Sequence, residues 1–431
     1  MLKAAAPTST RRFRNIVGGS AGNLVEWFDW YVYSAFALYF ASAFFPSGDQ
    51  TAQLLSTAAV FAVGFVMRPL GAWLMGIYAD HQGRKAGLTL SVTLMCAGSL
   101  LIAVAPTHAQ AGLVSPAVLL AARILQGISL GGEYGSSATY LSEMAGRERR
   151  GFWSSFQYVT IIGGQLLALA LLVTLQAFLS EAQLEAWGWR LAFAAGGALA
   201  VVAYVIRRRL DETLSFRSVA AQADRPKSSS RNLFRDHPRE AFLVMALTAG
   251  GTAAFYAYTI YLQKFLVNTS GFDRATASRI MTVALAIMML VQPLAGRLSD
   301  RVGRKPIMIT FGVCGTLFTY PIFTTLATTR DAAAAFALVM TALIIVTGYT
   351  SINAVVKAEL FPSHIRALGV ALPFAIANTI FGGTAEYVAL WLKAAGHERW
   401  FYVYISALIA GSLVAYVSMR ETKVTSLIEE D

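Results

Sequence analysis

The sequence predicts an all-α integral membrane protein with twelve transmembrane helices in two pseudo-symmetric halves of six. Three observations support this fold class. The 431 residues are 56% hydrophobic and only 14% charged, whereas soluble domains are about 25% charged. Twelve apolar runs are each long enough to cross a bilayer core of about 30 Å. A ten-residue segment that follows the second run recurs after the eighth.

Each apolar run predicts one helix, because about 20 apolar residues in helical conformation span the hydrocarbon core. The runs of the first half are 16–45, 52–79, 86–105, 113–142, 151–179 and 187–208. The runs of the second half are 239–267, 275–299, 306–326, 332–357, 367–393 and 400–419. Basic residues before the first run resemble the start of a secretory signal, but that run is too long and contains Glu26 and Asp29. We therefore expect it to be retained as the first helix.

One long polar stretch, 209–238, separates the sixth and seventh runs and divides the chain into halves 1–208 and 239–431. Its charged, serine-containing composition predicts a flexible linker. Most of the 35 basic residues lie in the N-terminal tail, in this linker and in the loops on the same side. Basic residues near helix ends are retained in the cytoplasm. We therefore expect a multi-pass protein whose linker and two termini are cytoplasmic.

The composition also excludes several classes of function. The net charge of +11 comes from short basic runs between apolar segments, which is a topology signal and not a nucleic-acid-binding face. The two cysteines lie in separate apolar runs and the five histidines never pair at ligand spacing, so we expect neither a metal nor a cofactor. No Gly-x-x-x-x-Gly-Lys-Ser/Thr loop is present to support ATP-driven pumping. An integral membrane enzyme, the alternative of a different class, would need a catalytic cluster that these histidines do not supply.

The repeated segment has the pattern Gly-x-x-x-Asp-x-x-Gly-Arg-Lys and occurs at 76–85 and 296–305. A match at one constant offset indicates that the halves repeat each other, and such repeats place the substrate path at their interface. An acidic and basic turn at the cytoplasmic mouth can bind the end of a neighbouring helix and release it when the halves rock. The predicted gate residues are Gly76, Asp80, Gly83, Arg84, Asp300, Gly303 and Arg304.

These loops, together with Arg123-Ile-Leu-Gln126-Gly127 in the fourth run, resemble the major facilitator superfamily over the whole chain. The segments that are similar to its metabolite:proton symporters are 22–29, 68–71, 131–135 and 187–190. The segments that most resemble the bacterial 2-oxoglutarate permeases are 157–165, 263–268 and 381–387.

The resemblance implies a proton-coupled secondary transporter of the bacterial inner membrane that imports a dicarboxylate by alternating access. Its first candidate substrate is 2-oxoglutarate. The alternatives are the sister symporters for citrate, shikimate or a compatible solute such as betaine. We expect the carrier to be a monomer that contacts the lipid bilayer, its small-molecule substrate and protons.

Five charged side chains lie deep within the apolar runs of the first half, namely Glu26, Asp29, Arg68, Arg123 and Glu133. Each would cost roughly 2.5 to 3.5 kcal/mol if it faced the middle of the bilayer, so we expect all of them to face the protein interior. A rise of 1.5 Å per residue places four of them at a shared depth of roughly 15 to 22 Å from the cytoplasmic ends, with Arg123 above them at about 30 Å.

The acids among these residues are candidates for proton coupling. Glu26 and Asp29 are three residues apart and share one helical face. A carboxylate near an arginine in a low-dielectric cavity can change its proton occupancy. The sugar porters of the superfamily resemble this arrangement, and the resemblance implies coupling by Asp29 with Arg123. We predict that Asp29, Glu26 or Glu133 carries the proton; a fixed ion cluster that joins the first and fourth helices is the alternative.

The arginines are candidates for substrate binding. A guanidinium group is suited to bind a carboxylate with two parallel hydrogen bonds. Arg68 has no evident partner in its own helix and is the first candidate for the anchor, with Arg123 second. Pairing of Arg68 with Glu26 or Glu133 is the alternative.

Four further residues complete the predicted substrate site. Arg190 and Lys264 lie near the outer ends of their helices, where snorkelling to lipid headgroups is the alternative. The resemblance to the 2-oxoglutarate permeases makes both candidates for substrate binding. Tyr256 and Gln157 are polar groups within apolar runs that we expect to line the path. Glu386 is interpreted as an outer-edge residue without a role.

Overall fold

The computed structural model describes residues 9–46, 49–82, 84–131, 134, 138–139, 141–142, 145–208, 229–362 and 365–428. Side chains are described for these residues except at 9–22, 76–82, 84–89, 206–208 and 367. Throughout this part of the chain the regular elements are helices, which confirms the predicted fold class. Ten of the described helices are long and apolar enough to cross a membrane, and Leu90–Val104 is a shorter apolar helix.

The first six apolar runs form helices in the predicted order. Their bounds are α1 Ser9–Phe44, α2 Gln50–Gln82, α3 Arg84–Val104, α5 Val114–Gly131, α7 Arg150–Ser154, α8 Phe156–Phe178 and α10 Trp189–Arg208. The short segments between them are α4 His108–Ala111, η1 Arg147–Arg149, α9 Glu181–Gln183 and η2 Leu184–Gly188. The fifth run is divided at Ser155, which lies between α7 and α8.

The second six runs also form helices, several of them interrupted. The first segments are α12 Ser230–Asp236, α13 Pro238–Tyr256, η3 Ala257–Tyr261, α14 Leu262–Asn268, α15 Arg274–Val302 and α16 Arg304–Thr328. The others are α17 Ala332–Thr350, α18 Asn353–Glu359, α19 Arg366–Ala377, η4 Asn378–Gly382, α20 Ala385–Ala394, α21 Glu398–Ser418 and α22 Thr422–Thr425. The π-helical segments η3 and η4 break the regular hydrogen-bond ladder, a feature that is frequent at functional sites.

Part of the segment that the sequence predicts as a flexible linker is helical. α12 occupies residues 230–236, directly before α13. The hydroxyl of Ser229 accepts a hydrogen bond from the backbone N–H of Arg231 at 3.2 Å, and Leu233 is fully buried. An N-terminal cap and one apolar contact therefore stabilise this short helix. Residues 209–228 lie outside the described residues.

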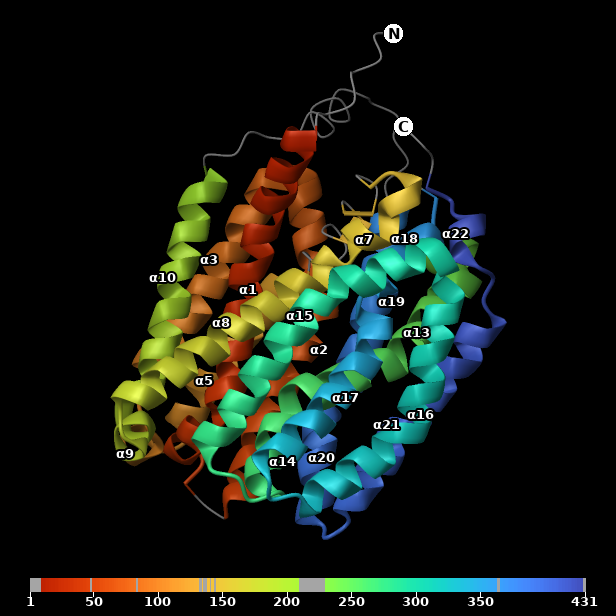
Figure 1. Cartoon of the computed structure of the whole chain (residues 1–431). Helices are drawn as coiled ribbons and strands as arrows, with labels where there is room; N and C mark the ends of the chain where they lie inside the picture. The colour runs from red at the N-terminus through yellow and green to blue at the C-terminus, as the bar shows by residue number, and fades with distance from the viewer. Residues whose placement is uncertain are drawn as a thin grey trace.

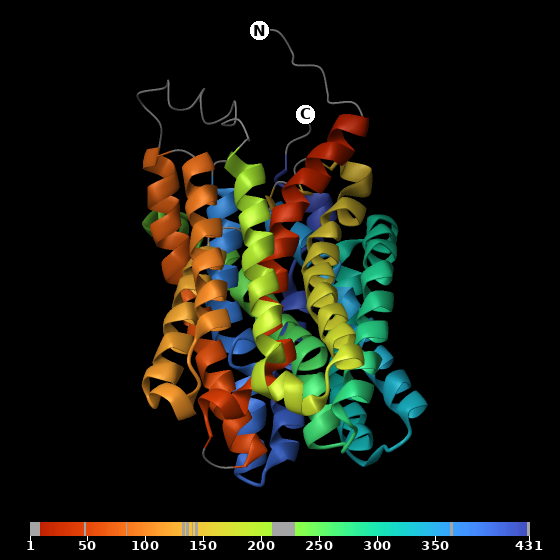
Figure 2. The ribbon, with the colours of Figure 1, turned by 90° about the vertical axis from the view of Figure 1, so that its left-hand side faces the viewer.

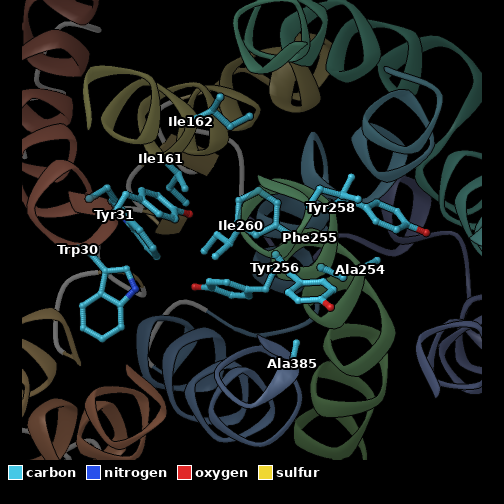
Figure 3. Close-up of a cluster of buried hydrophobic side chains, with 14 of the residues drawn as sticks. Trp30, Tyr31, Ile161, Ile162, Ala254, Phe255, Tyr256, Tyr258, Ile260 and Ala385 are labelled. Atoms are coloured by element: carbon cyan, nitrogen blue, oxygen red, sulfur yellow. The ribbon is translucent and has the colours of Figure 1, made fainter. Parts of the chain in front are cut away.

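The helices pack side by side in two groups, red to yellow-green and green to blue in Figure 1, and run roughly parallel to one another in Figure 2. α8 packs against α15 and α2 packs against α20, so these pairs join the two groups. The start of α1 and the helix α22 lie at the same end of the molecule (Figure 1). Aromatic and aliphatic side chains from both groups meet at the centre, where Tyr31 and Ile161 lie near Ile260 and Tyr256 (Figure 3).

Glycines let α2 and α5 approach each other closely. A β-carbon at Gly127 would collide with the backbone of Gly64, and one at Gly131 would collide with the backbone of Arg68. Small residues permit such close backbone contact between helices in a membrane protein. This crossing places Arg68 of α2 beside the segment of α5 that carries Arg123.

Candidate functional site

Two arginines of the first half lie close to one aromatic ring. The Cζ atom of Arg68 on α2 is 4.2 Å from the ring centroid of Trp30 on α1, and the Cζ atom of Arg123 on α5 is 3.9 Å from it. Both guanidinium groups are buried, and the ring stabilises nearby cations through its negative faces. The two side chains, for which residue counting predicts different depths, thus both reach the same ring of α1.

Arg68 has unused hydrogen-bonding capacity. Its Nε and Nη2 atoms are buried without a partner, and none of the described carboxylates pairs with it. Its described neighbours include the rings of Trp27, Trp30 and Phe65, the last 3.9 Å from its Cζ atom. A buried cation without an anion is costly. This arrangement can accept a carboxylate.

A pocket lies beside Arg68 and is lined by both halves of the chain. The first half contributes Asn23, Trp27, Arg68, Leu130, Gly131 and Tyr134, and the second half contributes Ala371, Phe374, Ala375 and Asn378. The space between these side chains is about 20 Å³, which holds a water molecule or two but no dicarboxylate. The structure is therefore closed around this point.

The acid of the first helix lies in a separate, fully buried cluster. Asp29 accepts a hydrogen bond from the hydroxyl of Ser99 on α3, and from Nε2 of Gln126 on α5 at 2.7 Å. Nη1 of Arg123 donates to Oε1 of the same glutamine at 2.7 Å. Gly196 of α10 packs so closely that a β-carbon there would collide with Asp29. Asp29 thus does not line the pocket, and Gln126 connects it to Arg123.

The two other predicted proton carriers are less fully described. Glu26 is buried on α1, three residues before Asp29. Glu133 lies outside the described residues. The choice among the three acids therefore stays a prediction.

Two predicted substrate ligands lie away from the pocket. Nη1 of Arg190 donates to the backbone carbonyls of Ala103 and Ala105, at 3.1 and 2.6 Å, at the end of α3. Gln157 is fully buried on α8 and does not line the pocket. We therefore leave both out of the proposed site. Tyr256, in contrast, lies beside Arg68 and Asn378.

Lys264 and Glu386 form a buried ion pair. Nζ of Lys264 lies 2.6 Å from Oε1 of Glu386 and 2.9 Å from the hydroxyl of Ser34 on α1. Both charged side chains are almost completely buried. The interpretation of Glu386 as an outer-edge residue is therefore wrong, and Lys264 does not snorkel to the lipid surface. Sequence reasoning could not find the pair because its members are 122 positions apart.

The second copy of the repeated loop contacts the first half. The carboxylate of Asp300 accepts hydrogen bonds from the backbone N–H groups of Gly151 and Phe152, at 2.8 and 2.9 Å. Nη1 of Arg304 lies 2.8 Å from the same carboxylate. Gly303 ends α15 with φ of +100°, a conformation that other residues rarely adopt.

The first copy of the loop is not described at this level. The surroundings of Gly76 and the side chains of Asp80 and Arg84 are not described, and Gly83 lies outside the described residues. The second copy is completed by Glu359, whose carboxylate lies 3.8 Å from Arg150 and 3.6 Å from Arg304.

Lys357 is a further buried cation that the sequence analysis did not single out. It lies at the end of the run 332–357, where a lysine ordinarily marks the cytoplasmic boundary. The structure instead buries it completely, with Nζ donating to Oδ1 of Asn353 at 2.9 Å. The one feature of the sequence that could have indicated this burial is that Lys357 belongs to the apolar run and does not follow it.

The fold and the pocket between its halves are those of a membrane transport protein. The chain belongs to the Major Facilitator Superfamily, whose sequence model matches residues 20–385, and the predicted resemblance is thereby confirmed. The alpha-ketoglutarate permease of Escherichia coli (strain K12) is 52% identical over 423 residues, which cover 98% of this chain and 97% of that protein.

More distant relatives match most of the chain, and a solved structure shares its fold. A citrate-proton symporter of Klebsiella pneumoniae is 31% identical, with 90% of this chain and 87% of that protein covered. A proline/betaine transporter of Salmonella typhimurium is 28% identical, with 94% and 83% covered. The proton:xylose symporter XylE bound to 6-bromo-6-deoxy-D-glucose has a TM-score of 0.80 at 19% identity, with 98% and 99% covered. The likeness to XylE shows the fold alone.

Proposed function

We propose that this protein is a proton-coupled secondary transporter that imports a dicarboxylate by alternating access, with 2-oxoglutarate as its first substrate. The observation that carries the proposal is the buried guanidinium of Arg68, which lines a pocket between the halves and lacks a carboxylate partner among the described residues. The 52% identity to the alpha-ketoglutarate permease supports the substrate. Alpha-ketoglutarate is another name for 2-oxoglutarate.

Arg68 anchors one carboxylate of the substrate. Its Nε and Nη2 atoms are the free donors, and a guanidinium can present two parallel N–H groups to a carboxylate. Tyr256, which lies beside Arg68, is proposed to orient it. Arg123 stays the second candidate, because its Nε and Nη2 atoms are also buried without partners.

Asp29 is the proposed proton carrier. A change of its protonation changes the negative charge that Gln126 and Arg123 face, and Arg123 shares the Trp30 ring with the anchor Arg68. These contacts form a continuous path from the proton site to the substrate pocket. Glu26 and Glu133 supply further carboxylates on α1 and in the fourth run.

Electrically neutral import of a dianion requires two protons. Moving a dianion into a cell against about 100 mV, negative inside, costs about 4.6 kcal/mol, at 2.3 kcal/mol per charge. One proton halves this cost, and two make the step electrically neutral. The three candidate acids are sufficient for two protons.

The repeated loops are the proposed gates of alternating access. In this structure Asp300 holds the first turn of α7 by two backbone hydrogen bonds, and Arg304 holds Asp300. Release of these bonds would open this end of the path when the halves rock. Because the segment repeats, we assign the same gate role in the other half to Gly76, Asp80, Gly83 and Arg84. Gly303 permits the turn before Arg304.

The gate end is assigned to the cytoplasm by the distribution of basic residues. The carrier then has both termini inside, lies in the bacterial inner membrane, and acts as a monomer of the halves 1–208 and 239–431 joined by 209–238. Its partners are the lipid bilayer, the dicarboxylate and protons, without nucleic acid and without a resident metal or cofactor.

Uptake by purified protein in proteoliposomes tests the proposal. With an acidic exterior and a potential negative inside, labelled 2-oxoglutarate should accumulate above its external concentration, and a protonophore should abolish the accumulation. Citrate and betaine, the substrates named for the relatives at 31% and 28% identity, should compete weakly. Accumulation of citrate, shikimate or betaine in place of 2-oxoglutarate would assign the chain to a sister symporter. Chemical conversion of the added compound without transport would favour a membrane enzyme.

A further inference from the structure

Lys357 is a buried ammonium group for which the proposed mechanism has no use. It is 0% exposed on α18, and its Nζ atom donates to Oδ1 of Asn353 at 2.9 Å. Three aromatic rings of the described residues also lie near it: Nζ is 4.1 Å from the ring centroid of Phe374 and 5.8 Å from those of Tyr134 and Tyr349. None of the described carboxylates forms an ion pair with it.

The neighbours of Lys357 form one wall of the pocket beside Arg68. Tyr134 of the first half and Phe374 of α19 both line that pocket. Their rings are stacked, with centroids 3.8 Å apart and an interplanar angle of 11°. The hydroxyl of Tyr134 donates to Oδ1 of Asn353 at 3.0 Å, the same oxygen that Lys357 binds. The ammonium group therefore lies against the same stacked rings that line the pocket.

This environment does not satisfy the charge of Lys357. A buried ammonium needs a paired anion or several strong acceptors, and one amide oxygen plus ring faces supply much less. Lys264 shows the contrast within the same half, because its buried ammonium is paired with Glu386 at 2.6 Å. The two buried cations around the pocket, Arg68 from the first half and Lys357 from the second, thus both lack an anion among the described residues.

We infer that Lys357 binds the second carboxylate of the transported dicarboxylate, while Arg68 binds the first. The inference rests on the proposed function and names the residue that distinguishes dicarboxylates from monocarboxylates. Separation of the Tyr134 and Phe374 rings would join the two cations in one cavity, which is too small for the substrate while the rings are stacked. A dicarboxylate that touches Arg68 and Lys357 would bridge the two halves, so that its binding would favour closure around it.

Titration calorimetry of the full-length protein in nanodiscs tests this role. The two probes are 2-oxoglutarate and 2-oxopentanoate, which has the same chain length but only one carboxylate. In Lys357→Met the affinity for 2-oxoglutarate should fall by at least about 30-fold, as expected when one partner of a buried charge pair is truncated, while that for 2-oxopentanoate should change less than about threefold. Lys357→Arg should retain most of the preference for the dicarboxylate.

Two controls separate this role from a loss of folding. Lys393→Met removes a lysine of α20 that already contacts Thr269 at 2.7 Å and Glu398 at 3.5 Å, and it should leave both affinities unchanged. Thermal unfolding without ligand should show that Lys357→Met is at least as stable as the parent protein, because it removes an unpaired buried charge.

The outcomes distinguish the inference from the proposed function. If the unmodified protein binds 2-oxoglutarate and Lys357→Met weakens both probes equally or weakens neither, Lys357 is not the second ligand and the transporter assignment stands. If the unmodified protein binds no dicarboxylate at all, the proposed function and the inference fail together.

Discussion

The carboxylate of Asp300 accepts a hydrogen bond of 2.8 Å from the backbone N–H of Gly151, across 149 positions of sequence. The contact joins the end of α15 to the first turn of α7 and therefore ties the second half to the first. The approach is close enough that a β-carbon at Gly151 would lie 2.6 Å from the backbone oxygen of Gly296. The sequence repeat thus supplies both the acid and the neighbouring glycine of a contact between the two halves.

Replacement of Asp300 by asparagine should weaken this contact. The amide retains one acceptor oxygen but loses the charge that Arg304 and two N–H groups share. We expect uptake of labelled 2-oxoglutarate by proteoliposomes to fall at least tenfold while the protein stays folded. Asp331→Asn is the control, because Asp331 caps α17 at 2.7 Å and asparagine is an equally good cap. Normal uptake by Asp300→Asn would remove this residue from the gate.

The anchor is tested by Arg68→Lys. We expect transport to fall at least tenfold although the charge is kept, because a compact ammonium cannot reproduce the planar pair of donors. Competition binding with 2-oxoglutarate provides the measurement. The control is Arg330→Lys, an exposed arginine that binds only the carbonyls of Ala327 and Thr329. Near-normal affinity of Arg68→Lys would show that Arg68 is not the anchor and would make Arg123 the first candidate.

Proton coupling is tested by Asp29→Asn. A permanently neutral amide mimics the protonated acid, so uphill accumulation under a pH gradient should be lost while exchange of internal for external substrate continues. Asparagine keeps one acceptor oxygen for Ser99 or Gln126, which limits structural damage. Asp273→Asn, at the N-cap of α15, is the control for loss of a charge elsewhere. If Asp29→Asn still concentrates substrate, Asp29 is not the coupling site, and Glu26 and Glu133 are tested in the same assay.

The ion pair of Lys264 and Glu386 predicts a stability effect. Lys264→Met leaves a buried carboxylate without its cation, and breaking a buried pair typically costs about 3 to 5 kcal/mol. We therefore expect a clear fall in the thermal unfolding temperature, and its recovery in the double variant Lys264→Met/Glu386→Gln. A variant Lys264→Met that unfolds normally but binds 2-oxoglutarate weakly would instead support the direct substrate role that the sequence predicts.

The orientation is tested by labelling from outside. In a variant whose Cys96 and Cys314 are replaced by serine, a cysteine at Ser228 should not react with an impermeant maleimide in intact cells. A cysteine at Arg330, which is exposed after α16, should react. The reverse pattern would invert the predicted topology.

The arrangement around Lys357 shows which information the sequence lacked. Its position at the end of an apolar run is also that of an ordinary boundary lysine. Its burial depends on Tyr134 and Phe374, which are more than 200 positions apart from each other and stack only after the halves pack. The same holds for Glu386, whose partner Lys264 is 122 positions away. No local pattern encodes such pairings.

The sequence by itself determined the membrane-spanning helices, their order, the internal repeat and the family, because each depends on local composition or on motifs at short spacing. It also placed Asp29, Arg68 and Arg123 in the protein interior, since charges that face lipid are costly. Only the tertiary structure decided their partners: Gln126 between Asp29 and Arg123, Trp30 near both arginines, and the pocket beside Arg68. The physical reason is that helix tilt, glycine-mediated crossings and the docking of the halves set distances between side chains, and these depend on the whole packed chain.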